Sequence, residues 1–296
     1  MLTRRRFLQG AGAMVALGAG GTAYAVGLEP HMRLVVTEWT IPHAHWPQDM
    51  PALRIAVLTD IHASDPWMPA ARIGGIVERA NMLNPDVILL LGDYVAAMSR
   101  YGTKDLPIAD WSAELGRLRA PLGVYAVLGN HDWWTDPEGV RGGLEREGIR
   151  VLENDALKLD VHGDPVWLGG LGDQLALRGK GRRRGVDDLP ATLAPAKRDD
   201  APYILMVHEP DIFTRVPERV TLTLAGHTHG GQVNLPFVGR PVIPSRYGQR
   251  FAYGHIVENG RHLLVSSGLG LSGVPVRFMV PPEIALVTLT SASGAA

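Results

Sequence analysis

Residues 53–62 have the sequence LRIAVLTDIH, in which an apolar run ends abruptly in polar residues. Short apolar runs with such sharp ends are typical of buried β-strands. The pattern returns as VILLLGD at 87–93, VYAVLGNHD at 124–132, YILMVHE at 203–209 and TLTLAGHTHGG at 221–231. We therefore expect five buried strands, each followed at once by Asp, Asn or His. Open α/β sheets build their sites at the carboxyl ends of their strands, so these side chains should gather at one edge.

The spacing of apolar residues between the early strands is that of helices. Apolar residues recur at three- and four-residue intervals over 73–83, where an Asn-Pro pair stops the pattern. Further helices are expected at 110–119 and 137–147. The first half of the chain therefore alternates strands with helices.

Strands in the second half follow one another more closely. A hairpin is expected over 157–168, and two more strands at 262–266 and 284–290. Flanking helices early and hairpins late favour an α/β fold of two packed mixed β-sheets flanked by helices, an α-β-β-α sandwich. No repeat or linker divides the chain, so we expect one domain over residues 29–290 and a disordered tail at 291–296.

The composition is that of an ordinary folded protein. Of the 296 residues, 46% are hydrophobic and 20% are charged, unlike the composition of disordered chains. The formal net charge of -1 gives no reason to expect a nucleic-acid partner. Cysteine is absent, which excludes disulfides, thiolate metal sites and a cysteine nucleophile.

The first 28 residues have the features of a targeting segment. Residues 4–8 are RRRFL, the stretch 10–28 carries no charge, and AYA at 23–25 offers a signal-peptidase site. This opening resembles a twin-arginine signal, which implies the twin-arginine (Tat) export machinery as a partner and a periplasmic location. In the alternative, residues 1–28 remain as an anchor in the inner membrane, because the uncharged stretch is long enough to span a bilayer.

Seven potential metal ligands follow the five strands. A single Asp after a strand is often only a helix cap, but seven such groups would not gather without a cation to offset their desolvation and repulsion. Seven ligands are too many for one tetrahedral zinc, and they fit two divalent ions that share a carboxylate, an arrangement suited to displacement at phosphorus. Nitrogen and oxygen ligands without sulfur suit Mn, Fe or Zn. The seven residues are Asp60, His62, Asp93, Asn130, His208, His227 and His229.

These motifs, taken in order, resemble a known superfamily. The set Asp-x-His, Gly-Asp, Gly-Asn-His-Asp, His and Gly-His-x-His is similar to that of the calcineurin-like metallophosphoesterases, and the likeness extends over about 53–289. The resemblance implies that Asp93 bridges the two metals. It also implies that one metal is held by Asp60, His62 and His229, and the other by Asn130, His208 and His227.

The same resemblance assigns a catalytic role to His131. This residue would face the substrate as a general acid or phosphate stabiliser, with Asp132 either orienting it or serving as a structural cap. The stretch HEPD at 208–211 and PPE at 281–283 resemble a bacterial branch of exported phosphodiesterases and UDP-2,3-diacylglucosamine pyrophosphatases.

Several further residues are candidates for contact with the substrate. Trp133 and Trp134 are either core residues of the next helix or, together with Trp67, an apolar wall beside the metals. His255 is a further candidate for the border of the cleft. Such a wall would suit an amphiphilic phosphoester, and it raises the membrane surface as a further partner. The glycine-rich stretch GLGLSG at 268–273 is not followed by a helix, so we expect a tight loop near the metals rather than a dinucleotide site.

The sequence therefore predicts a binuclear metal-dependent phosphoesterase that cleaves phosphodiester or pyrophosphate bonds with a metal-activated hydroxide. One alternative is a UDP-2,3-diacylglucosamine pyrophosphatase of lipid A synthesis. Another is a metal-binding envelope protein without turnover. An assay on simple phosphodiesters and monoesters separates the enzymes from the non-catalytic alternative.

Overall fold

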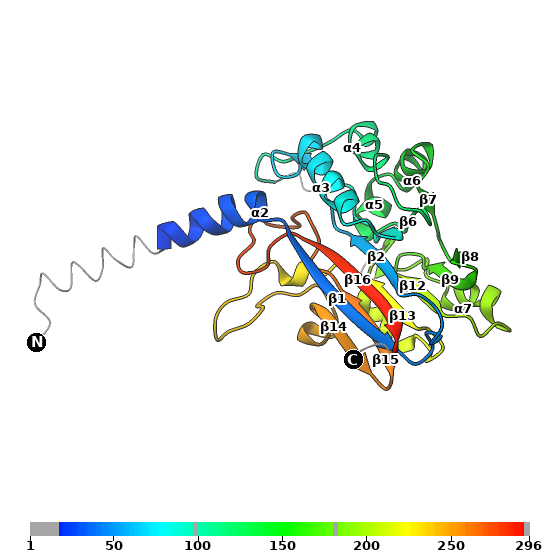
Figure 1. The fold of residues 1–296 in the computed structure, drawn as a ribbon. Helices are drawn as coiled ribbons and strands as arrows, with labels where there is room; N and C mark the ends of the chain where they lie inside the picture. The colour runs from blue at the N-terminus through cyan, green and yellow to red at the C-terminus, as the bar shows by residue number, and fades with distance from the viewer. Residues whose placement is uncertain (1–17, 98–99, 180–182, 293–296) are drawn as a thin grey trace, which may run out of the picture.

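The computed structural model describes residues 18–97, 100–179 and 183–292. Two six-stranded mixed sheets pack against each other at the centre of the protein (Figure 1). Helices cover the outer face of each sheet, so the layers run helix, sheet, sheet, helix. This arrangement confirms the expected α-β-β-α sandwich.

The first sheet has the strand order β1-β16-β2-β4-β6-β7. Strands β2, β4 and β6 are parallel to one another, so the loops that follow them leave from the same edge. The strands are β1 (Val35–His43), β16 (Glu283–Ser291), β2 (Leu53–Leu58), β4 (Val87–Leu90), β6 (Val124–Ala126) and β7 (Arg150–Val151).

The second sheet has the strand order β14-β15-β13-β12-β9-β8. Its four central strands are parallel, and an antiparallel strand closes each side, including the hairpin β8–β9 that the sequence predicts. The strands are β14 (Gly254–Glu258), β15 (Arg261–Val265), β13 (Leu222–Ala225), β12 (Tyr203–Met206), β9 (Asp164–Gly170) and β8 (Asp155–Val161).

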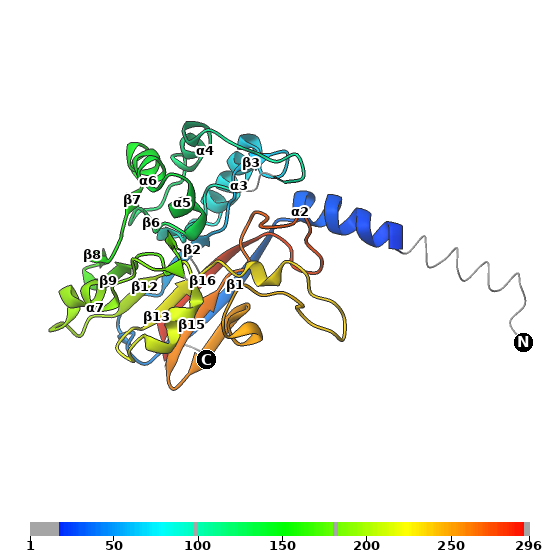
Figure 2. The ribbon, with the colours of Figure 1, turned by 180° about the vertical axis from the view of Figure 1, so that it is seen from behind.

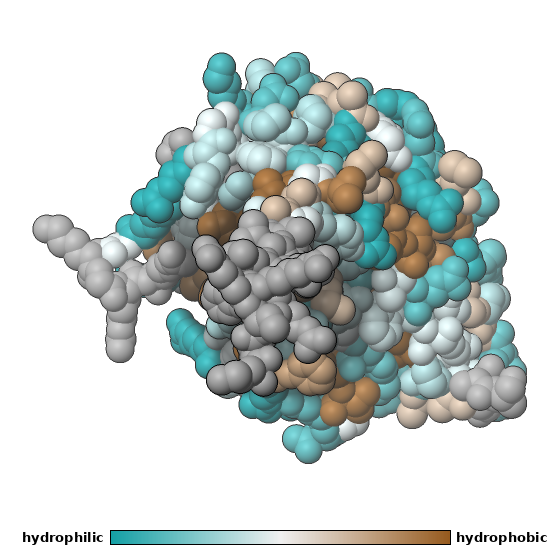
Figure 3. All heavy atoms as spheres, turned by 90° about the vertical axis from the view of Figure 1, so that its left-hand side faces the viewer, coloured by the Kyte–Doolittle hydropathy of each residue, from teal (hydrophilic) through white to brown (hydrophobic). Residues whose placement is uncertain are grey.

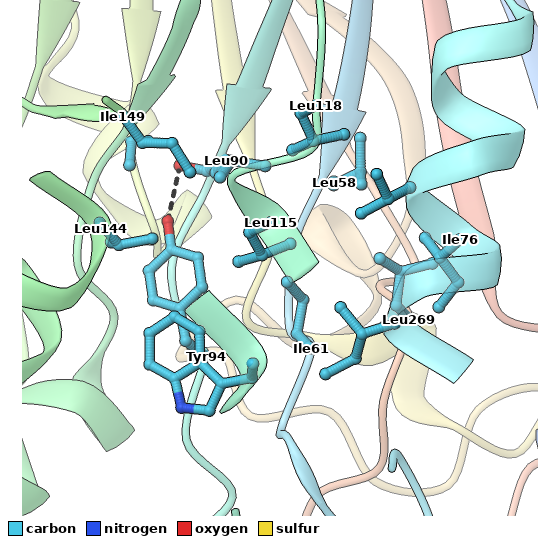
Figure 4. Packing of buried hydrophobic residues seen from close by; sticks show 14 of the residues in the cluster. Leu58, Ile61, Ile76, Leu90, Tyr94, Leu115, Leu118, Leu144, Ile149 and Leu269 are labelled. Carbon is cyan, nitrogen blue, oxygen red and sulfur yellow. Dashed lines mark hydrogen bonds between the residues drawn. The ribbon is translucent and has the colours of Figure 1, made fainter. Parts of the chain in front are cut away.

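Four helices cover the outer face of the first sheet. Ile76 and Leu115 of these helices pack with Leu58 and Leu90 of the sheet, and the hydroxyl of Tyr94 donates to the Leu90 carbonyl at 3.3 Å (Figure 4). The helices are α3 (Ala70–Met82), α4 (Ile108–Leu115), α5 (Asn130–Thr135) and α6 (Pro137–Arg146).

Two further apolar layers complete the core. Between the sheets, Val57 and Leu89 of the first sheet pack with Ile204 and Leu224 of the second. Short helices cover the outer face of the second sheet, with Phe213 and Phe251 packed edge to face at 5.8 Å. These helices are α7 (Leu189–Leu193), η2 (Ala194–Ala196), η3 (Pro210–Arg215) and η5 (Gly248–Phe251).

Some element boundaries differ from the sequence predictions. The helix expected at 110–119 is α4, which begins at Ile108 and ends at Leu115, because a turn at Gly116 stops it. Strand β16 extends to Ser291, one residue beyond the predicted end of the domain, because Ser291 pairs with His43 of β1. Residues 293–296 of the predicted tail lie outside the described residues.

The N-terminal segment packs against the domain. Its described part is helical and includes η1 (Tyr24–Leu28) and α2 (Glu29–Met32). The helix α2 lies at the body, and the segment before it projects away (Figures 1 and 2). The carbonyl of Ala25 accepts the Arg277 backbone N–H at 2.9 Å. The arginines of the predicted export signal lie outside the described residues. Of the helices within the described ranges, none has the length and apolar character needed to cross a membrane.

Candidate metal centre

The backbone at the strand ends is held in an unusual conformation. Five of the predicted ligands have positive φ angles, between 49° and 67°, a region that residues other than glycine rarely occupy. Such strain persists where the surrounding structure enforces it, and it clusters at functional sites. These five residues are Asp60, His62, Asp93, His227 and His229.

The first group of donors comes from both sheets. Asp60 and His62 follow β2, and His229 follows β13; the three ligand atoms lie within 4.8 Å of one another. Nε2 of His62 is 3.1 Å from Nε2 of His229, which is 3.5 Å from Oδ1 of Asp60. All three side chains are buried, so this group could hold a metal ion between the sheets.

The second group of donors lies beside the first. Asp93, His208 and His227 again place three ligand atoms within 4.8 Å of one another. Oδ2 of Asp93 is 3.2 Å from Nε2 of His208 and 3.6 Å from Nε2 of His62. Asp93 therefore lies between the two groups, where the resemblance places a bridging ligand.

Asn130 supplies the clearest evidence for a cation. Its Oδ1 is buried, and no hydrogen-bond partner for it is found within the described part of the chain. A buried oxygen without a donor is costly, whereas amide oxygens bind divalent cations readily. The residues present thus fit divalent metal ions, and the structure brings all seven predicted ligands to one place.

Hydrogen bonds from Nδ1 to backbone carbonyls orient the imidazoles of His62 and His208. Nδ1 of His62 lies 3.1 Å from the Val95 carbonyl, and Nδ1 of His208 lies 2.7 Å from the Leu91 carbonyl. Each Nδ1 therefore carries the hydrogen and donates it, which leaves Nε2 as the ligating atom. Such outer partners fix the tautomer and orientation of metal-binding histidines.

Burial sets the protonation of the site. Burial lowers the pKa of His62 to about 3 and raises the pKa of Asp60 to about 7. Burial and the neighbouring His62 and Arg277 also hold the pKa of His229 well below its usual value. Neutral imidazoles are ready to bind a metal, and a buried carboxylate needs a positive charge beside it.

Asp93 and His208 form a tightly coupled pair. Burial alone would raise the pKa of Asp93, but the imidazoles of His208 and His131 outweigh it and hold that pKa well below its usual range. Burial alone would lower the pKa of His208, but the Asp93 carboxylate outweighs it and raises that pKa. A cation held here would replace the proton on His208, so metal binding at this position would release a proton.

Asp132 is a structural clamp. Its carboxylate accepts backbone N–H groups from Asp93 and Gly129, both at 2.9 Å, and two more from Tyr94 and Val95. It thereby ties the loop after β4 to the start of α5. Of the two roles that the sequence left open, capping is the one that the contacts show.

Glycines allow the loops to approach the ligands. A Cβ on Gly129 would lie 2.3 Å from Oδ1 of Asp93 and 2.8 Å from Cε1 of His208. A Cβ on Gly268 would lie 2.7 Å from Cβ of Asp60. The glycine-rich stretch is therefore a tight loop against the metal ligands, as the sequence predicts.

His131 faces an open cleft beside the donors. Nδ1 of His131 lies 2.7 Å from the Ala96 carbonyl, and its ring centroid is 5.2 Å from that of Trp134. The cleft has a volume of about 810 Å3 and reaches from the donors to a wall that includes Val233, Val242 and Val274. A smaller cleft of about 530 Å3, more polar in its lining, adjoins it at Arg246.

The other candidate contact residues lie elsewhere. Trp67 stacks on His31, with ring centroids 5.3 Å apart, and Trp133 packs against the core of the first sheet. His255 pairs with His262 across the β14–β15 hairpin, at 3.1 Å between ring nitrogens. These three side chains contact neighbouring residues of the protein and do not line the cleft. Of the expected aromatic wall, only Trp134 lines the cleft.

Two sets of charged side chains near the donors are not among the predicted site residues. Arg277 is fully buried behind His229, with Nη2 3.4 Å from Nδ1 of His229 and closer contacts to three backbone carbonyls. Asp173 and Glu209 form a buried acidic group with His208, and burial raises the pKa of Asp173 to about 10. A neutral Asp173 adds no negative charge to the site.

Comparison with known proteins relates these features to a family. The family model described as calcineurin-like phosphoesterase matches residues 53–231, which contain all seven predicted ligands. The metallophosphoesterase YkuE of Bacillus subtilis is 33% identical over 98% of both chains. The phosphodiesterase YaeI of Escherichia coli is 29% identical over 98% of this chain and 100% of its own.

Among solved structures, a 5'-nucleotidase precursor from Thermus thermophilus resembles the chain over 74% of its length, at a TM-score of 0.48 and 16% identity. The match covers 49% of that protein.

Proposed function

The chain belongs to the calcineurin-like phosphoesterase family and is a metal-dependent phosphoesterase, and on this basis we propose that it uses two divalent ions to hydrolyse phosphodiester or pyrophosphate bonds. The observation that carries the proposal is the pair of donor groups with Asp93 between them. Asp60, His62 and His229 would hold one ion. Asn130, His208 and His227 would hold the other.

The residues around the donors suit displacement at phosphorus. Two neighbouring divalent ions neutralise phosphate oxygens and lower the pKa of a water between them. Nδ1 of His131 donates to the Ala96 carbonyl, so Nε2 is the atom left to exchange a proton with the leaving group. The backbone N–H of His131 donates to Oδ1 of Asp93 at 2.8 Å and holds that carboxylate in place.

The cleft favours a substrate with an apolar part. Val233, Val242, Ile243 and Val274 line one side, and Trp134 lies beside His131. The guanidinium of Arg178 lies 4.2 Å from the Trp134 ring centroid, which places a positive charge beside Trp134. We infer an amphiphilic phosphoester, with the charged phosphate at the donors and the apolar portion along the valines.

For the cellular location we infer export by the twin-arginine route with retention of the N-terminal segment. The motif at residues 4–8 supports export. The burial of Ala25 and Glu29 against the domain favours retention, because a signal peptidase needs an accessible, extended site. The protein would then face the periplasm while anchored to the inner membrane.

One experiment tests the proposed activity. Purified protein loaded with Mn2+ or Zn2+ would be assayed on bis-p-nitrophenyl phosphate, p-nitrophenyl phosphate and UDP-2,3-diacylglucosamine. We expect hydrolysis of the diester to exceed that of the monoester, and removal of metal with a chelator to abolish it. Preference for the nucleotide-linked lipid would indicate the pyrophosphatase of lipid A synthesis. Metal binding without hydrolysis of any of the three would contradict the proposal and indicate a non-catalytic protein.

A further inference from the structure

Large hydrophobic side chains are exposed beside the cleft. Phe237 is fully exposed, and Val238, Val242 and Met279 each expose more than half of their surface. Exposed apolar patches of this kind on soluble proteins mark interaction sites. We call this surface the apolar rim; it comprises Leu28, Met32, Leu235, Phe237, Val238, Val242, Val274 and Met279.

Backbone contacts join the apolar rim into one surface. Phe278 exchanges hydrogen bonds with the loop after η4 (His229–Gly231): its carbonyl accepts the Asn234 N–H, and its N–H donates to the Gln232 carbonyl, both at 2.9 Å. The ring of Phe278 meets Tyr24 of η1 edge to face at 6.1 Å. The loop that carries Phe237 thus extends on the same side as the N-terminal helix (Figures 1 and 2).

The apolar rim is also tied to the metal centre. The side chain of Gln232 donates to the Ser272 carbonyl at 2.8 Å and accepts the Ser272 N–H at 2.9 Å. Nε of Arg240 donates to the Gly230 carbonyl at 2.7 Å, next to His229. Residues 242 and 274 of the apolar rim line the cleft itself. Whatever covers this surface therefore lies at the mouth of the catalytic cleft.

The exposed charges within the segments that form the apolar rim have one sign, and the neighbouring Asp211 accepts hydrogen bonds from Ser245 and Arg246 beside the cleft. The residues of the apolar rim come from segments 18–33, 233–248 and 268–282, in which the single acidic residue, Glu29, is buried. The exposed charges in these segments are arginines, at positions 33 and 246, with Arg240 partly exposed. An apolar surface bordered by cations matches the interface of a bilayer that contains anionic lipids.

The chain that precedes this surface has the same character. Residues 10–28 carry no charge, and their described part leaves the body at the apolar rim. Figure 3 looks onto the face from which this segment leaves, and hydrophobic residues are exposed there among hydrophilic ones. A membrane-seeking segment and an apolar rim on one face would meet the same bilayer together.

We propose that the apolar rim docks on the surface of a bilayer containing anionic lipids, with Phe237 inserted at the level of the headgroups. Docking would open the cleft toward the membrane, so an amphiphilic phosphoester could enter from the lipid phase. The docking stands on the surface alone, whereas this route for the substrate rests on the proposed function.

The absence of cysteine allows a direct test. A single Phe237→Cys substitution in the full-length chain would be labelled with the polarity-sensitive dye nitrobenzoxadiazole and reconstituted into vesicles of phosphatidylcholine and phosphatidylglycerol. The matched control is Val257→Cys, because Val257 is also an exposed hydrophobic residue but lies in β14, away from the apolar rim. We expect a blue shift and a roughly twofold rise in emission at position 237, and no change at 257.

Two results would overturn the proposal. In one, the protein floats with the vesicles but the label at 237 shows the same emission as in water. This would show that only the N-terminal segment meets the bilayer. A shift that appears without vesicles and grows with protein concentration would assign the surface to a second copy of the chain.

Kinetics separate docking from catalysis. Phe237→Ser should raise KM for a p-nitrophenyl phosphodiester carried in vesicles by about tenfold, because a buried phenylalanine contributes that much to partitioning. Turnover of soluble bis-p-nitrophenyl phosphate should stay unchanged, since Phe237 is not part of the cleft. Equal KM values for the vesicle-borne ester in both proteins would contradict docking. Failure of the unmodified protein to hydrolyse the soluble ester would instead contradict the proposed function.

Discussion

At the scale of single residues, the site contains two kinds of side chain: the predicted metal ligands, and the residues that hold those ligands in position. The predicted ligands follow the strands directly, so the sequence alone selects the seven side chains that the structure gathers at one place. The clamp of Asp132 could not be predicted in the same way, because its partners Tyr94 and Val95 are far from it in the sequence. Arg277 is likewise placed behind His229 only by the fold.

His131 is predicted to act in turnover without holding a metal. His131→Ala should retain both ions and lose turnover by roughly a hundredfold or more, since a positioned acid or base contributes about that factor. Metal content by mass spectrometry and kcat on bis-p-nitrophenyl phosphate check this. An emptied site in the variant would move His131 into the ligand set, and its Nε2 would then have to complete the group with His62 and Asp93.

Asp132 is predicted to stabilise the metal-free fold. Asp132→Asn puts an amide N–H2 against backbone N–H donors, which should lower the free energy of unfolding by about 2 kcal/mol or more. Urea denaturation of the metal-free protein measures it. The matched control is Asp136→Asn, an exposed cap of α6 that accepts one N–H and should cost less than about 1 kcal/mol. Equal losses in the two variants would refute the clamp.

At the scale of elements, the sequence pattern was sufficient to predict a helix or a hairpin whose stabilising contacts are between residues close in sequence. The helix over 73–83 and the hairpin β8–β9 follow from apolar spacing. Strand β1 was not predicted, because its stability comes from pairing with β16, which lies more than 200 residues later. The wall of the cleft was also missed, since its valines come from irregular loops without periodicity.

The contribution of the end of β1 to the stability of the fold should depend on pH, through the protonation of His43. His43 is buried there beside His262 and accepts the backbone N–H of His45 at 3.0 Å, and burial lowers its pKa from 6.5 to about 4. The folded state thus favours the neutral ring. Its stabilising effect is complete above pH 6.5 and is lost as the pH falls toward 4.

We therefore expect the free energy of unfolding of the metal-free protein to decrease as the pH is lowered from 6.5 to 4. The decrease should be smaller in the His43→Asn variant. Urea titrations at several pH values measure the slope. His162→Asn, at an exposed turn, is the control and should keep the slope of the unmodified protein. A slope that His43→Asn leaves intact would contradict this role.

The N-terminal helix is predicted to be part of the fold. The buried carboxylate of Glu29 accepts the N–H groups of Met279 and Val280 at 2.8 and 2.5 Å. Glu29→Ala leaves both donors without a partner and should cost about 2 kcal/mol or more. Thermal unfolding and protease sensitivity of the segment check it, with exposed Glu38→Ala as the control. Unchanged melting in Glu29→Ala would show that the segment is dispensable.

At the scale of the whole molecule, the two sheets bring the donors together. Asp60, His62 and Asp93 come from the first sheet, and His208, His227 and His229 from the second. Neither sheet alone offers a complete set. The sequence predicted both sheets from their strands, but only the packing of the apolar layer between them places the two loop edges side by side.

Counting the bound ions tests the central claim most directly. Metal-free protein would be titrated with Mn2+ in a calorimeter, beside Asp93→Asn, and the bound metal confirmed by mass spectrometry. The account predicts two equivalents per chain in the unmodified protein, and weaker binding of both in the variant because the shared carboxylate is lost. A stoichiometry of one or less, or two equivalents that Asp93→Asn binds as tightly, would contradict it.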